Sequence, residues 1–199
     1  MFVTAMRKTP FILLLVLCLC WQAGPAVGAA SRKVSRGSGQ PAIDAARLEK
    51  KIHALVNQER KKAGLTALAW DDRLRHIARD YSQEMATGGF FSHSDPEGRD
   101  FSDRYQAAGY DCATPSGPRT LCLGGENLAR NNLCRAIVRQ KGRTTYRWNT
   151  EAQLAAEVVR QWMASEGHRR NILTGYFRRQ GIGVSVAKDG KVYVTENFC

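Results

Sequence analysis

Two histidines and one glutamate are the residues of this sequence whose types and surroundings best suit chemistry. His93 lies in the turn-rich segment FFSHSDPEGRDFSDR, Glu126 lies in GGENLA, and His168 follows Gly167 in WMASEGHRRNIL. Each stands beside a glycine or a turn, where a rigid scaffold commonly displays its functional side chains. Two imidazoles and a carboxylate can bind a divalent metal ion or transfer protons as acid and base.

Zinc suits such a set, because neutral imidazole nitrogens bind it and a nearby carboxylate can ligate or accept a proton from bound water. His93 and His168 are the predicted metal ligands, and no firm third ligand is evident, so zinc or another divalent cation is an optional cofactor. With a metal bound, Glu126 and His168 are the candidate catalytic residues of a metal-assisted hydrolase. The alternative is a buried polar network in which these side chains only stabilise the fold.

Other catalytic classes find little support. The sequence has no GxSxG nucleophile elbow and no HExxH zinc motif, and the glycines around Glu126 do not form a phosphate loop. Ser92 and Ser94 flank His93 along the chain, but neighbours in sequence do not make a catalytic triad, and a role in the turn accounts for them.

The elements that must position these residues follow from hydrophobic periodicity and capping residues. Helices are predicted over about 42–63, from Asp71 to Gly88, over 100–108 and from Thr150 to Gly167. The Asp-Gly pair at 189–190 lies between two alternating apolar runs and predicts a β-hairpin. Between Glu126 and Asn149 no clear period is evident. Helices followed by an antiparallel pair favour an α+β fold.

The N-terminus predicts export. Residues 1–30 have the pattern of a signal peptide, residues 31–44 that of a flexible basic linker, and residues 45–199 form one domain. Removing Arg7 and Lys8 lowers the formal charge from +12 to +10 (12 minus 2). We expect a secreted monomer, extracellular or periplasmic, with no nucleic-acid partner and with electrostatic attraction to anionic envelope surfaces.

Four of the six cysteines remain after processing (6 minus 2), which in an oxidising compartment favours two disulfides. Three connectivities are open. The preferred pairing is Cys112 with Cys122, closing a short loop, and Cys134 with Cys199, fastening the C-terminus. A zinc–cysteine site is disfavoured because the sequence has no CxxC pair.

Five motifs together resemble the CAP superfamily (cysteine-rich secretory proteins, antigen 5 and pathogenesis-related 1; SCP domain), in its bacterial secreted form. They are, in chain order, Leu55-Val56-Asn57-Gln58-Glu59-Arg60, Phe91-Ser92-His93-Ser94 leading to Pro96-Glu97-Gly98-Arg99, Gly125-Glu126-Asn127-Leu128-Ala129, Gly167-His168-Arg169-Arg170-Asn171-Ile172-Leu173 and Gly181-Ile182-Gly183-Val184. The resemblance covers about 45–198. It implies an α-β-α sandwich, with a central antiparallel sheet between helical layers and a surface cleft.

The resemblance also implies which residues line that cleft. Matched by motif, the family's two histidines are His93 and His168, its GEN-motif glutamate is Glu126, and Asn171 lies in the second histidine's motif. Animal and plant members have a further glutamate three residues after the helix tryptophan, where this chain has Ser165. Glu166, one position further on, is a candidate replacement in the cleft.

The expected function is therefore a secreted, disulfide-stabilised CAP-domain protein acting as a binding module. The resemblance implies a lipid or sterol, cell-wall material or an extracellular protein as ligand in or beside the cleft. The alternatives are a metal-dependent hydrolase, peptidase-like, acting through Glu126 and His168, and a purely structural extracellular role.

Overall fold

The structure is a computed structural model and describes residues 39–199. The predicted signal peptide (1–30) and residues 31–38 of the predicted linker lie outside the described residues. Among the helices that are described, none combines the length and the apolar character needed to cross a membrane.

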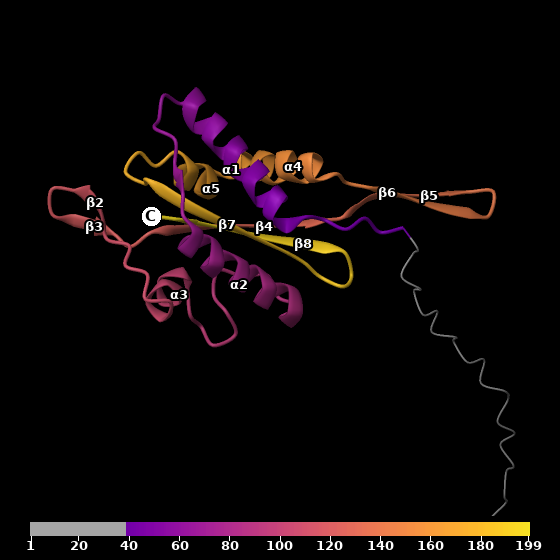
Figure 1. The fold of residues 1–199 in the computed structure, drawn as a ribbon, viewed down its shortest axis with the longest axis horizontal. Coiled ribbons are helices and arrows are strands. Elements are labelled where there is room, and N and C mark those ends of the chain that lie inside the picture. The colour runs from indigo at the N-terminus through magenta and orange to yellow at the C-terminus, as the bar shows by residue number, and fades with distance from the viewer. Residues whose placement is uncertain (1–38) are drawn as a thin grey trace, which may run out of the picture. The chain divides into compact units, whose positions relative to one another are not determined.

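A four-stranded sheet with strand order β1-β7-β8-β4 lies between two layers of helices (Figure 1). Helices α1, α4 and α5 cover one face, and α2 and α3 cover the other. This confirms the predicted α+β sandwich; the sheet is antiparallel except for the short pair of β1 with β7. The bounds are α1 (Ala45–Lys62), β1 (Ala69–Trp70), α2 (Asp72–Gly88), α3 (Phe101–Ala107), β4 (Gly125–Asn132), α4 (Glu151–Ala164), α5 (Glu166–Ile172), β7 (Arg179–Val186) and β8 (Lys191–Phe198).

Strand β8 is buried on both faces because helices cover both sides of the sheet. Val192 and Val194 belong to the core shared with α1 and α4, whereas Tyr193 packs with Tyr81 and Met85 of α2. Side chains alternate between the two faces of a strand, so one strand contributes to two cores. The predicted turn at 189–190 joins β7 to β8, and this hairpin is confirmed.

Helix α2 lies directly on β7, and two glycines make this approach feasible. A Cβ atom built on Gly181 would lie 2.1 Å from the backbone nitrogen of Arg75, and one on Gly183 would lie 2.0 Å from that of Arg79. Those distances are far inside van der Waals contact. The two glycines of the GIGV motif therefore set the spacing between the helix and the sheet.

Arg60 links α1 to the segment that follows α5. Its guanidinium is buried and donates to the backbone oxygens of Thr66, Ile172 and Thr174 at 2.6–2.9 Å. Burial lowers the pKa of Arg60 from its usual value. These bonds satisfy carbonyl groups at the end of α5, and so hold the helix that carries His168.

Two hairpins stand outside the central sheet. Strands β2 (Thr114–Gly117) and β3 (Thr120–Cys122) form one, and β5 (Cys134–Gln140) and β6 (Arg143–Trp148) form the other. The second occupies the segment in which the sequence shows no clear period, and it extends beyond the end of the sheet (Figure 1).

The preferred disulfide pairing is wrong. Cys112 is bonded to Cys199, with their Cα atoms 5.6 Å apart, and Cys122 and Cys134 are free thiols. Gly125 pairs with Phe198 at one end of β4 and Asn132 pairs with Lys191 at the other, so Cys134 lies a full strand length, about 27 Å, from the C-terminus. Cys112 is buried beside Cys199, whereas Cys122 packs against the core on the α1 side of the sheet.

Candidate functional site

The candidate site lies at β4, the edge strand of the sheet, and is built around Glu126. Alternation along β4 places Glu126 on the α2–α3 side and Asn127 on the α4–α5 side. Glu126 accepts a hydrogen bond from His93 Nδ1 at 2.8 Å and another from Arg104 Nη2 at 2.6 Å. Its side chain is only 1% exposed, so the carboxylate is buried between these two partners.

Arg104, on α3, is a site residue that the sequence reasoning missed. Its guanidinium also donates to the backbone oxygen of His93 at 3.3 Å and lies 3.4 Å from the centre of the Tyr81 ring. A buried carboxylate is stable when a cation pairs with it, and that requirement was the available signal. Nothing in the local pattern indicates which of the many arginines supplies the charge.

His93 is held on an ordered loop. The Asp95 carboxylate accepts from the backbone nitrogens of Glu97 and Arg99 at 2.9–3.0 Å and from Arg99 Nε at 2.7 Å. Burial raises the pKa of Tyr81 to about 12, so its hydroxyl keeps the proton that it donates to the Ser92 oxygen at 2.7 Å. The His93 side chain remains 55% exposed, which makes it the accessible member of the site.

His168 approaches His93 from the other side of β4. The predicted single helix is interrupted: α4 ends at Ala164, Ser165 is extended, and α5 begins at Glu166, with Gly167 inside it rather than ending it. The centres of the two imidazole rings are 6.3 Å apart. Burial, and then the neighbouring His93, lowers the pKa of His168, which favours the neutral imidazole at pH 7.

The other two predicted cleft residues have different positions. Asn171 Nδ2 donates to the Glu126 backbone oxygen at 3.1 Å and to Asn127 Oδ1 at 2.9 Å, so it fixes α5 against β4. Glu166 is not brought to the others. Its side chain is 79% exposed and pairs with Arg170 at 2.7 Å.

A buried acid on β8 is linked to the site through Asn127. Glu196 on β8 is fully buried and accepts a hydrogen bond from Asn127 Nδ2 at 3.1 Å, and the same amide donates to the His168 backbone oxygen at 3.2 Å. Burial raises the pKa of Glu196 to about 8, so the group is mostly the neutral acid at pH 7. The sequence reasoning did not single out this residue.

The two histidines lie near each other, and the hydrogen bond to Glu126 defines which nitrogen of His93 could bind a metal ion. A carboxylate can only accept, so the contact with Glu126 places the His93 proton on Nδ1 and leaves Nε2 free, the arrangement common in zinc-binding histidines. Two imidazoles that share zinc at about 2.0 Å have ring centres roughly 5–6 Å apart, slightly less than the 6.3 Å between these two rings. A bound ion would have two protein ligands and would make its bound water more acidic.

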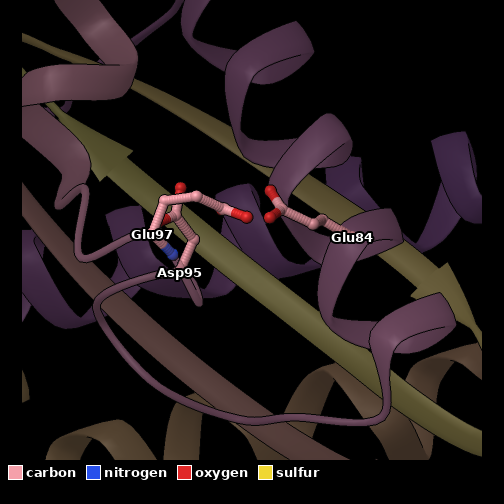
Figure 2. A group of neighbouring side chains, drawn as sticks. All are labelled: Glu84, Asp95 and Glu97. Atoms are coloured by element: carbon pink, nitrogen blue, oxygen red, sulfur yellow. Dashed lines mark hydrogen bonds between the residues drawn. The ribbon is translucent and has the colours of Figure 1, made fainter.

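A cluster of three carboxylates lies elsewhere in the described structure. Within the described part of the chain, Glu84, Asp95 and Glu97 are the group of three whose ligand atoms lie within 4.8 Å of one another. Figure 2 shows the Glu84 carboxylate extending from α2 toward that of Glu97 on the loop. The Asp95 oxygens are already bound by Arg99 and two backbone amides, so this residue organises the loop.

The sequence is similar to a known protein family and to two proteins of Bacillus subtilis. The sequence model of the CAP family, described as "Cysteine-rich secretory protein family", matches residues 53–198. The uncharacterized protein YkwD of Bacillus subtilis is 34% identical over 150 residues, which are 75% of this chain and 46% of that protein. The uncharacterized membrane protein YlbC of the same organism is 27% identical over 34% of its length. The chain thus spans less than half of these relatives.

Two solved structures are similar in fold. An extracellular protein of Bacillus anthracis that contains an SCP domain is 28% identical, with a TM-score of 0.53 over 81% of this chain and 44% of that one. An outer surface protein of Borrelia burgdorferi is 19% identical, with a TM-score of 0.58 over 78% of this chain and 94% of that one. The second likeness concerns the fold alone.

Proposed function

The chain belongs to the CAP family of cysteine-rich secretory proteins, and on that premise we propose that it is an exported binding module whose ligand contacts His93 and His168. The observation that carries this proposal is the state of Glu126. Both carboxylate oxygens are hydrogen-bonded and the side chain is 1% exposed. Glu126 therefore orients the exposed imidazole of His93, while the two histidines supply the surface that a ligand can contact.

The ligand that suits this surface has a polar or anionic group able to bond with imidazole. Neutral His168 can donate one hydrogen bond and accept another, and His93 presents Nε2. An envelope lipid headgroup, a cell-wall fragment and a protein carboxylate all offer such groups. The similar Bacillus anthracis protein is described as extracellular, which supports a ligand of the same compartment.

Titration calorimetry of zinc into the metal-free protein tests whether the two histidines act together. The wild type and a His76→Ala control should bind zinc, since His76 is a histidine on α2 away from the site. The double variant His93→Ala, His168→Ala should lose that binding. Equal binding by the double variant and the control would contradict the proposed site.

A metal-assisted hydrolase is the second candidate, and one observation favours it. The pairing of Glu126 with His93 Nδ1 is the carboxylate–histidine arrangement that accompanies catalytic zinc. Peptide and cell-wall fragments offered to the zinc-loaded protein test this reaction. If it occurs, Glu126→Gln should abolish turnover while zinc binding largely survives; under the binding proposal, no zinc-dependent cleavage is expected.

A purely structural role makes a separate prediction. In that case His93→Ala, His168→Ala should leave the extracellular function of the protein unchanged, although zinc binding is lost. A screen of envelope lipids and cell-wall fragments against the wild type and this variant distinguishes the two roles, because only the binding module requires the histidines.

A further inference from the structure

The β5–β6 hairpin lies apart from the histidine site. Its two strands pair mainly with each other and extend beyond the central sheet (Figure 1). The hairpin follows β4 at the end where Asn132 pairs with Lys191, whereas Glu126 lies near the opposite end of the same strand. The hairpin can therefore contact another molecule or a membrane surface without covering the histidine site.

The charge of the hairpin has one sign. It carries five basic residues and no aspartate or glutamate, and these basic residues are Arg135, Arg139, Lys141, Arg143 and Arg147. All five are exposed, and none is in an ion pair within the part of the chain that the structure describes. Such a concentration of unpaired positive charge attracts an anionic surface.

Large apolar side chains accompany these charges. Ile137, Val138 and Tyr146 are 53%, 38% and 41% exposed. They are three of the six large apolar side chains that are exposed in residues 39–199. A concentration of exposed apolar side chains on one element is typical of an interaction surface, so the feature indicates a partner that receives both charge and apolar surface.

The strand register places most of the apolar groups on one face. Ile137 is directly opposite Tyr146, and the Tyr146 ring stacks on that of Trp148, with ring centres 5.5 Å apart. Arg139 lies two residues beyond Ile137 and so shares this face. Trp148 also lines an open groove of about 530 Å³ at the base of the hairpin, beside Ile43. The apolar face thus continues from the strands to the body of the domain.

We propose that the β5–β6 hairpin attaches the protein to bilayers that contain anionic lipid. Tyrosine and tryptophan rings suit the interface between headgroups and acyl chains, and arginine side chains bind lipid phosphates while their stems cover apolar surface. Ile137 favours a lipid surface over a soluble polyanion, because an aliphatic side chain gains from apolar contact and offers no stacking platform or charge to a polymer.

Vesicle co-sedimentation tests the proposal, with equimolar phosphatidylglycerol and phosphatidylcholine compared with phosphatidylcholine alone. Every variant is expressed from the full chain, so that all the compared proteins have the same N-terminal residues. The wild type should bind the anionic vesicles only. Arg139→Glu with Arg143→Glu should weaken binding by roughly 25-fold or more, from about fivefold for each charge removed.

The charge control is Lys61→Glu with Arg119→Glu, which makes the same change at two exposed positions outside the hairpin. It should retain most of the wild-type binding. An equal loss in both charge-reversed variants would overturn the proposal, because the attraction would then belong to the net charge of the whole protein and not to the hairpin.

The apolar contribution is tested by Ile137→Ser with Tyr146→Ser. Its control is Leu121→Ser with Leu123→Ser, which removes two exposed leucines at and just after β3. The hairpin variant should lose binding several-fold at constant charge, and the control should not. Unchanged binding of the hairpin variant, together with equal affinity of the wild type for soluble polyphosphate, would assign the surface to an anionic polymer and overturn attachment to lipid.

Discussion

At the scale of single residues, the site depends on a pairing that joins two distant segments. Arg104 from α3 and His93 from the preceding loop meet Glu126 on β4. The sequence motifs identify His93, Glu126 and His168, because each stands in a short pattern of its own. They do not identify Arg104 or Glu196, since the role of each depends on a partner supplied by another element of the fold.

Replacing Arg104 should therefore destabilise the protein strongly. Arg104→Met leaves the Glu126 carboxylate buried with only His93 as partner, and loss of one member of a buried ion pair costs about 3–5 kcal/mol. Urea unfolding measures the loss. Arg160→Met is the control, because Arg160 and Glu157 form a solvent-exposed pair, which water and salt screen strongly.

A second substitution separates the charge effect from lost packing. Adding Glu126→Gln to Arg104→Met removes the unpaired charge and should recover part of the stability. If the double variant is no more stable than Arg104→Met, the guanidinium acts through its packing on Tyr81 and not through its charge.

Glu196 should make stability depend on pH. Its pKa is about 8 in the folded protein, against an ordinary value of 4.5, because burial disfavours the carboxylate. Between pH 4.5 and pH 8 the folded protein keeps the Glu196 proton, whereas the unfolded chain loses it. The stabilisation that Glu196 contributes is therefore complete below pH 4.5. It falls as the pH rises toward 8, by at most about 1.4 kcal/mol per pH unit.

Glu196→Gln should remove this slope, because the amide stays neutral and can still accept from Asn127. Urea unfolding at pH 5 and pH 8 measures it: the variant should exceed the wild type in stability at pH 8 and differ little at pH 5. The same decline in both proteins would show that other groups cause the dependence.

At the scale of elements, periodicity and caps predict most of the secondary structure. Asp71 caps α2 and Thr150 caps α4, as expected, and the turn at 189–190 joins β7 to β8. The β5–β6 hairpin lacks such a signal, because its strands are not half-buried and so show no alternation. The break between α4 and α5 falls at Ser165, a residue that nothing in the local pattern marks as extended.

Two glycines provide a matched test of how the elements pack. Gly183→Ala would place a methyl group 2.0 Å from the α2 backbone, so we expect a loss of at least about 3 kcal/mol in unfolding free energy. Gly167→Ala meets nothing within 4 Å and lies inside α5, where alanine should add about 0.5–1 kcal/mol. Thermal unfolding compares them; similar melting temperatures would show that α2 does not rest on β7 as described.

At the scale of the whole molecule, cysteine pairing depends on topology and not on distance along the chain. The preferred pairing closed a short loop from Cys112 to Cys122 and gave Cys199 to Cys134, but the sheet order brings Cys112 to Cys199 across 87 positions. An even cysteine count predicts disulfides without specifying partners, and here two of the four remain thiols. The fold class follows from patterns within elements, whereas the pairing follows from how those elements are assembled.

Removing the disulfide should lower the stability of the domain more than removing the two free thiols. Closing a loop of this length restricts the unfolded chain, and its loss typically costs about 2–5 kcal/mol, so Cys112→Ser with Cys199→Ser should unfold at lower urea concentration. Cys122→Ser with Cys134→Ser should stay close to the wild type. Mass spectrometry of a non-reduced digest identifies the bond directly, and a peptide joining Cys112 to Cys122 would contradict the topology that places the C-terminal residue beside Cys112.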